Sequence, residues 1–333
     1  MELRKIYLSG GSTYVVSLPK HWVESMGVGR GDSVAMEERG NSLIVEPMLR
    51  EREVPPATIY VSEVNSPSSL QRVFVAHYLA GYEAIKVVLD TDDRQTYWDA
   101  TKDIAASLIG AELMDETKDY LFFEVLFDYK KMPTLRALRR MHALCHSMLE
   151  EIRLAIEEED VELALQTKSR EVETDRLYFL VVRQLKVALQ HHQLSEKLGI
   201  EHERDCLGYR VVVKSIERIS DHLSYIAESY AQLVSSGRRG ALKQYLPLFD
   251  MLEEVYSTSL DAILDKEYGQ LNTMFSIADE LESAIKDHFN ALFNETSTEE
   301  ALLKKSVLDA ISRVMSQSLG IAEIGINYSV RMP

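Results

Sequence analysis

Long amphipathic patterns fill the chain from about Pro133 to its end, and this feature limits the fold more than any other. One stretch carries apolar residues at alternating steps of four and three: Val212, Ile216, Ile219, Leu223, Ile226, Tyr230 and Leu233. That spacing is typical of a helix packed in a bundle. Proline and glycine are scarce in this part of the chain, so little interrupts its helices. The sequence therefore predicts a mainly α protein.

A weak internal repeat organises this helical part. The segment IERISDHLSYIAE, residues 216–228, aligns with ISRVMSQSLGIAE, residues 311–323, which lies 95 residues later. Upstream, residues 154–165 resemble residues 261–272 in the same way. Each copy has room for three long helices. We therefore expect two tandem three-helix bundles over residues 134–333, one at 134–236 and the other at 241–333.

Two smaller regions precede the bundles, and the composition changes near Pro47 and again near Pro133. Residues 1–48 contain short β-rich runs separated by glycine turns, with one short helix between two hairpins, which predicts a small β-rich domain. Residues 55–130 follow the order strand, helix, strand, helix, strand, strand. This order predicts a small α/β module.

The composition of the chain argues against several classes of protein. The 333 residues carry a formal charge of −16, from 37 basic and 53 acidic residues, which repels phosphate backbones at long range. No stretch reaches the roughly 20 apolar residues of a membrane span, and the N-terminus lacks a signal-peptide core. The only cysteines are Cys145 and Cys206, too few for a disulfide framework. We therefore expect a cytoplasmic protein.

Two pairs of carboxylates stand at helical spacing in the first bundle. Glu171 and Asp175 are four residues apart and share a helix face, whose stripe then turns mostly apolar. The next long helix carries Glu217 and Asp221 at the same spacing. If the two helices run antiparallel, the pairs meet on one surface, where they repel unless a cation lies among them. Oxygen ligands suit hard cations or carboxylate-bridged transition ions.

The spacing also fits a simpler interpretation. Acidic residues four apart are common on solvated helix faces, and Arg170, Arg176 and Arg218 are close enough in sequence to neutralise these pairs. The residues by themselves leave both interpretations open.

The phrase ERISDHLSYIAE, the preceding ExxxD helix and the degenerate second copy together resemble the PhoU family over about residues 133–333. Members of that family are tandem three-helix bundles that regulate phosphate uptake and bind metal on ExxxD motifs. The resemblance implies that Glu171, Asp175, Glu217 and Asp221 are the ligands of a divalent or trivalent ion, such as iron, zinc, manganese or magnesium.

The second copy departs from the family pattern. Ser312 and Ser316 replace the pair equivalent to Glu217 and Asp221, while Asp279 and Glu282 do not form an ExxxD pair. We expect weak metal binding there, or none.

A histidine and cysteine cluster offers another possible metal site. His142 and His146 share a helix face, and Cys145 lies beside them. A zinc site needs about four ligands, and no others are assigned to this face. Cys145 also continues the apolar seam, so we expect it to be buried as a small apolar residue.

Residues 3–47 resemble the AbrB-like swapped-hairpin domain. The matching features are the strand that ends in Leu18 and Pro19, the short helix, and the Gly-Val and Gly-Asp steps that follow it. The resemblance implies an intertwined homodimer, because such hairpins bury little apolar surface alone. Many such domains bind DNA, and residues 1–31 offer four basic residues for it: Arg4, Lys5, Lys20 and Arg30. Arginines that better-known members carry are absent, so pure dimerisation competes with DNA binding.

These features favour a regulator of phosphate uptake that is not an enzyme, in a fusion that looks like archaeal members of the family. Its expected partners are DNA, a second copy of the chain, and the phosphate transporter's ATPase subunit or another regulator. One alternative is an enzyme with a di-metal carboxylate site, hydrolytic or oxidative. The other is a dimeric scaffold with vestigial metal sites. Neither a glycine-rich phosphate loop nor a nucleophile motif occurs.

Overall fold

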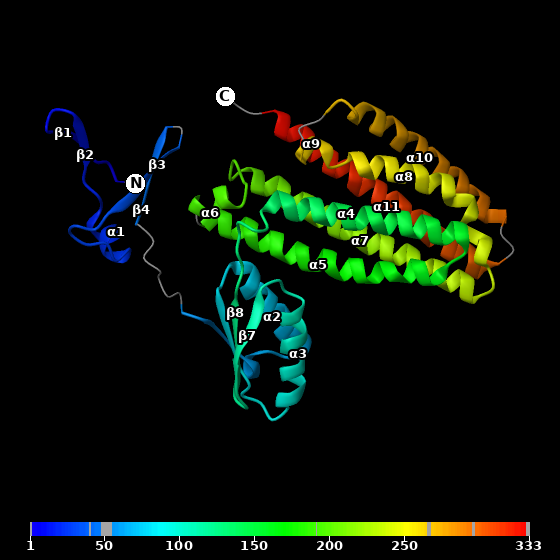
Figure 1. Cartoon of the computed structure of the whole chain (residues 1–333), viewed down its shortest axis with the longest axis horizontal. Helices are drawn as coiled ribbons and strands as arrows, with labels where there is room; N and C mark the ends of the chain where they lie inside the picture. Colours follow the sequence, from blue (N-terminus) through cyan, green and yellow to red (C-terminus); the bar gives the residue numbers. More distant parts are fainter. Residues whose placement is uncertain are drawn as a thin grey trace. The chain divides into compact units, whose positions relative to one another are not determined.

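The computed structural model describes residues 2–39, 41–47, 55–190, 192–264, 268–294 and 297–330. Within these residues the chain separates into two compact units, Met1–Pro55 and Pro56–Pro333 (Figure 1). The fold is mainly helical, with small sheets only before the helical bundles, which confirms the predicted fold class. The finer division into domains at 1–48, 55–130 and 134–333 stays a prediction.

The first unit contains two antiparallel hairpins and a short helix. In chain order its elements are β1 (Ile6–Ser9), β2 (Thr13–Val16), α1 (Lys20–Ser25), β3 (Val34–Arg39) and β4 (Ser42–Pro47). Strand β1 pairs only with β2, and β3 only with β4. None of the described side chains of this unit belongs to a buried core, and the side chains of Tyr14 and Ile6 are 76% and 69% exposed. A hairpin pair with so much apolar surface in water is marginally stable alone.

The second unit begins with a mixed sheet of four strands in the order β5-β6-β8-β7. Its elements are β5 (Ala57–Tyr60), a 3-10 turn (Val61–Glu63), α2 (Pro67–Ala80), β6 (Ala84–Val88), α3 (Arg94–Ala106), β7 (Ala111–Glu116) and β8 (Tyr120–Val125). Strands β5 and β6 are parallel, and the other pairs are antiparallel. Helices α2 and α3 pack together and cover a core that includes Phe74, Ile85 and Phe123.

Local sequence explains how α2 is fixed in this module. Ser66 caps its N-terminus by accepting a hydrogen bond from the Ser69 amide at 3.1 Å, and Pro67 occupies the first helical position, where its missing N–H costs nothing. Gly81 ends the helix with φ +99°, a conformation that other residues rarely adopt. A Cβ on Gly81 would lie 3.1 Å from the side chain of Val187, so this end of α2 lies close to the first helical bundle.

Within the described residues, six long helices form the two bundles. The first bundle contains α4 (Thr134–Glu158), α5 (Val161–Gln190) and α7 (Asp205–Ser235), with the short α6 (His192–Lys197) between the last two. The second contains α8 (Leu246–Thr258), α10 (Leu271–Ala291) and α11 (Thr298–Ser329), with α9 (Asp261–Leu264) and two 3-10 turns (Arg239–Tyr245 and Leu292–Asn294). Helix α7 packs along α5 on one side and along α11 on the other (Figure 1).

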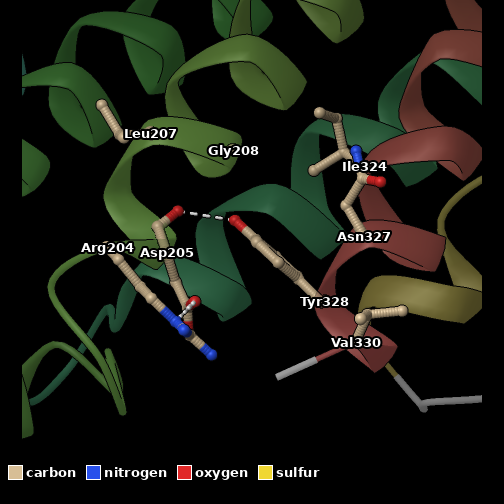
Figure 2. Close-up of a pocket in the computed structure, with 8 residues that line it drawn as sticks. All are labelled: Arg204, Asp205, Leu207, Gly208, Ile324, Asn327, Tyr328 and Val330. Carbon is tan, nitrogen blue, oxygen red and sulfur yellow. Dashed lines mark hydrogen bonds and ion pairs between the residues drawn. The ribbon is translucent and has the colours of Figure 1, made fainter. Parts of the chain in front are cut away.

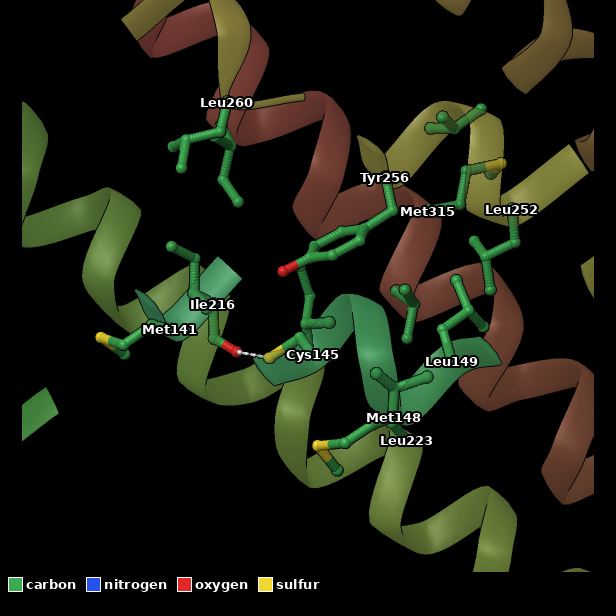
Figure 3. Packing of buried hydrophobic residues seen from close by; sticks show 14 of the residues in the cluster. Met141, Cys145, Met148, Leu149, Ile216, Leu223, Leu252, Tyr256, Leu260 and Met315 are labelled. Carbon is green, nitrogen blue, oxygen red and sulfur yellow. Dashed lines mark hydrogen bonds between the residues drawn. The ribbon is translucent and has the colours of Figure 1, made fainter. Parts of the chain in front are cut away.

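One continuous apolar core joins the bundles, because α4 and α7 of the first bundle contact α8 and α11 of the second. Figure 3 shows Cys145 and Met148 of α4 packed among Ile216, Leu223 and Tyr256. The ring of His142 stacks on that of Tyr256, 4.3 Å between centroids. The Tyr256 hydroxyl donates to the His142 carbonyl at 3.0 Å, and His142 Nε2 donates to the Tyr256 carbonyl at 3.0 Å. The bundles therefore form one packed body.

Candidate metal centre

The antiparallel packing of α5 against α7 brings three of the four predicted ligands together. Asp175 of α5 and Glu217 and Asp221 of α7 each present an oxygen, and these three oxygens lie within 4.8 Å of one another. Oxygens bound to one cation at roughly 2.0 to 2.6 Å lie about that far apart at most. The geometry therefore fits a single hard cation. Glu171 lies one turn before Asp175 on α5, outside this closest group.

Two lysines lie at the edge of the carboxylates. The Lys168 ammonium donates to both oxygens of Glu171, at 3.0 and 2.8 Å. The Lys214 ammonium donates to both oxygens of Glu217, at 2.5 Å each. Each lysine precedes its partner by three residues, a spacing that places them on one helix face. Arginines were predicted as the neutralising partners, but these lysines take that role, and their i,i+3 spacing is visible in the sequence.

Burial and the crowding of carboxylates raise the pKa of both aspartates. Burial raises the pKa of Asp175 to about 6, and the charges of Asp221, Glu217 and Glu171 raise it in the same direction. Burial and the charges of Glu217 and Glu171 likewise raise the pKa of Asp221 to about 6. Lys214 opposes both shifts without cancelling them. Four carboxylates with two ammonium groups leave negative charge that a divalent or trivalent cation would neutralise.

The histidine and cysteine cluster of α4 divides between two environments. Cys145 is fully buried, and burial raises the pKa of its thiol to about 12, which confirms its place in the apolar seam. His142 contacts Tyr256, as described above. His146 instead lies between two carboxylates, with Nδ1 3.4 Å from Glu150 and Nε2 3.8 Å from Glu253 of α8. The three residues considered for zinc therefore do not converge on one point.

Neither of the two groups of possible metal ligands found among the described residues includes Asp279 or Glu282 of α10. One group is Asp175, Glu217 and Asp221, and the other is His146, Glu150 and Glu253. Ser312 and Ser316, which replace the carboxylates of the first bundle, lie on α11. Weak metal binding by the second bundle stays a prediction.

The four basic residues predicted to contact DNA are exposed, and two of them have acidic partners. Arg4 forms an ion pair with Glu2, and the Lys20 ammonium lies 3.6 Å from a Glu24 oxygen. Lys5 and Arg30 are exposed as well. Glu2 and Glu24 reduce the positive charge that Arg4 and Lys20 present to a phosphate backbone.

Fold and site together define a two-part protein: hairpins with an unburied apolar surface, joined to a repeated helical body that carries a cluster of carboxylates. Within the described residues, every helix is too short or too polar to cross a membrane.

Comparisons with known proteins agree with this class. The family model for the PhoU domain matches residues 138–230, which cover most of the first bundle. The model described as antidote-toxin recognition MazE, bacterial antitoxin, matches residues 7–53. The chain therefore joins an N-terminal AbrB-like domain to a PhoU domain, as the sequence predicted. Both families are regulatory rather than enzymatic. Searches of curated proteins and of solved structures found no match.

Proposed function

We propose that this chain is a cytoplasmic regulator of phosphate uptake whose helical body binds a divalent or trivalent metal ion through Glu171, Asp175, Glu217 and Asp221. The observation that carries this proposal is the convergence of Asp175, Glu217 and Asp221 within 4.8 Å on the surface of the PhoU domain. A bound cation would relieve their repulsion and displace the ammonium of Lys214 from Glu217. Glu171 would join as a fourth carboxylate, released from Lys168.

Metal occupancy would then alter the surface that protein partners meet. In the metal-free form, Lys168 pairs with Glu171 on α5 and Lys214 pairs with Glu217 on α7. With metal bound, the lysines would be free and the carboxylates neutralised. This exchange of charge gives a partner, such as the phosphate transporter's ATPase subunit or another regulator, a way to distinguish the two states.

One substitution distinguishes the two interpretations of these carboxylates, as metal ligands or as a solvated acidic face. Asp175→Asn resembles the protonated carboxyl group, so in chelator at pH 8 it removes repulsion and should stabilise the protein by about 1 kcal/mol, less than the full pKa shift implies because the group is only partly buried. With metal present it should instead lower stability relative to the parent, because a ligand is lost and metal stabilises only the native state.

The measurement is thermal melting of parent and variant with chelator and with added Mn²⁺, Zn²⁺ or Fe³⁺, together with elemental analysis. Glu280→Gln, at an exposed position in the middle of α10, makes an equal change of charge away from the site and should show neither effect. The double variant Glu217→Ala, Asp221→Ala should carry no metal at this site. A parent that contains no metal and melts at the same temperature under all these conditions would refute the proposal.

We infer further that residues 1–48 pair two copies of the chain and place them on DNA. The support is the exposed apolar surface of the hairpins, where Ile6, Tyr14 and Met36 have side chains 69%, 76% and 59% exposed. An intertwined second copy would bury these side chains. Dimerisation would also double the exposed basic groups on one assembly.

Deleting residues 1–50 should change the mass measured by light scattering, and an unchanged mass would remove the hairpins as the pairing surface. DNA binding is measured by gel shift at several salt concentrations. Replacing Arg4, Lys5, Lys20 and Arg30 with alanine should weaken binding to every sequence, and each lost phosphate contact should reduce the slope of log affinity against log salt by about 0.9. If the parent gives no shift at low salt, the hairpins serve dimerisation alone.

A further inference from the structure

The two bundles meet along two pairs of helices, α7 with α11 and α4 with α8. At one end of the first pair the Tyr328 hydroxyl donates to the Asp205 carbonyl at 2.5 Å, beside a small pocket (Figure 2). A Cβ on Gly208 would lie 2.3 Å from the same hydroxyl oxygen, so these helices already touch. Direct packing therefore closes the first pair.

Two close contacts fix the register of α4 against α8. At one of them, His142 and Tyr256 stack their rings and exchange two hydrogen bonds of 3.0 Å. About three turns further along α4, Arg153 Nε donates to Asp250 Oδ1 at 2.5 Å. Residue numbers rise along α4 as they fall along α8, so the two helices are antiparallel. The side chains between these contacts are thus held at a defined separation.

An imidazole and two carboxylates lie between the two contacts. His146 and Glu150 are four residues apart on α4 and share a helix face, and Glu253 approaches them from α8. Nδ1 of His146 is 3.4 Å from a Glu150 oxygen, and Nε2 is 3.8 Å from a Glu253 oxygen. One possible ligand atom from each residue lies within 4.8 Å of the other two. The α4–α8 contact therefore gathers one nitrogen and two oxygen ligands.

These three side chains do not satisfy one another. A hydrogen bond from a ring N–H spans about 2.7 to 3.2 Å. Among the described residues, the side chains of His146, Glu150 and Glu253 make no hydrogen bond and no other ion pair. Ligands bound to one zinc ion at roughly 2.0 to 2.2 Å in tetrahedral geometry lie about 3.3 to 3.6 Å apart. The separations therefore fit a shared cation better than a direct bond.

We propose that His146, Glu150 and Glu253 bind a zinc ion between the two bundles, with water as the fourth ligand. Zinc accepts imidazole nitrogen together with carboxylate oxygen, whereas Mg²⁺ and Ca²⁺ take oxygen ligands. Two carboxylates also balance the charge of a divalent ion. One ring nitrogen binds the ion and both glutamates turn toward it, which they are free to do because the side chains of Glu150 and Glu253 are 55% and 33% exposed.

This site is separate from the carboxylates of α5 and α7 and goes beyond the proposed function. Helix α4 belongs to the first bundle and α8 to the second, so one ion bound by both would link the bundles. Because the metal binds only the native arrangement of α4 and α8, it stabilises that arrangement.

The test is calorimetric titration of Zn²⁺ into the full chain after metal has been removed with chelator. The double variant Glu217→Ala, Asp221→Ala loses two proposed ligands of the other site, so its zinc binding reports on the α4–α8 contact alone. It should still bind zinc, and added zinc should raise its melting temperature. His146→Gln in this background should weaken binding by more than the roughly 10- to 100-fold that loss of an outer-shell partner costs, and should abolish the rise in melting temperature.

A matched pair of variants on α8 controls for charge. Glu253→Gln should weaken zinc binding about as much as His146→Gln, whereas Glu254→Gln, at the exposed neighbouring position, should leave the affinity unchanged. Zinc binding that is present in the parent and lost in the double variant would place all the metal at α5 and α7 and overturn this proposal alone. Equal affinities for His146→Gln, Glu253→Gln and Glu254→Gln would also overturn it. Equal zinc binding by the parent and the double variant would support it and count against the other site.

Discussion

Arg183 of α5 is the residue whose replacement should most clearly separate the α/β module from the bundles. Its side chain is 1% exposed, yet it carries a full positive charge. One terminal nitrogen donates to the carbonyls of Tyr78 at 2.5 Å and Tyr82 at 2.9 Å, and the other donates to the carbonyl of Gly81 at 3.2 Å. These are the carbonyls at the C-terminal end of α2, where a cation is also favoured by the helix dipole.

The magnitude follows from these contacts. A hydrogen bond to a charged group contributes about 1.5 to 3 kcal/mol, and three such bonds from one group are not additive. The buried Nε of Arg183 has no partner, so part of the cost of burying the guanidinium is not recovered in the native state. Arg183→Met should therefore lower the free energy of unfolding by about 3 kcal/mol, because it removes the guanidinium bonds to three carbonyls at this helix end. Of these carbonyls, that of Tyr78 still accepts from the Gly81 amide at 3.1 Å.

For a unit of this size that loss lowers the melting temperature by roughly 6 to 12 °C. Circular dichroism melting measures it, and hydrogen exchange of the amides near the end of α2 locates it. Lys186→Met is the matched control, because Lys186 is exposed on the same helix. Arg183→Lys should give an intermediate loss, since one ammonium cannot reproduce the planar arrangement of donors.

The result that refutes this reasoning is a melting temperature for Arg183→Met within about 2 °C of that for Lys186→Met. It would mean that water replaces the guanidinium at the end of α2, so the carbonyls are not left without donors. Faster exchange confined to α2, with unchanged melting of the bundles, would instead mean that the module separates locally and that Arg183 holds it in place.

Two further predictions concern the helix contacts. Gly208→Ala should destabilise the protein by about 1 to 3 kcal/mol, because its Cβ would lie 2.3 Å from the Tyr328 hydroxyl oxygen; an unchanged denaturation midpoint would contradict so close an approach of the helices. Burial lowers the pKa of His142 from 6.5 to about 4, so the unfolded chain binds a proton first as the pH falls. This contribution to stability is complete above pH 6.5 and declines toward pH 4, by about 2 to 3 kcal/mol in all. His142→Gln, which can still donate to the Tyr256 carbonyl, should flatten that decline in urea melts at pH 7.5 and 4.5, and equal slopes for parent and variant would refute the assignment.

Local sequence patterns were enough to predict the helices, the strands and the fold class. Apolar steps of three and four define one buried face along each long helix, so the seam from Val212 to Leu233 could be identified without a structure. Spacing of four likewise puts Glu171 with Asp175, and Glu217 with Asp221, on single helix faces. The order of strands and helices in residues 55–130 was readable for the same reason, since periodicity and turn residues are local properties of the chain.

Tertiary structure decided how these faces meet. Helical periodicity leaves free the rotation and the register of one helix against another, and those are set by packing of the whole core. Only the register of α5 against α7 selects Asp175, Glu217 and Asp221 as the closest group, with Glu171 beside it. The contact of Arg183 with the end of α2 joins residues about a hundred positions apart, so no local sequence pattern predicts it.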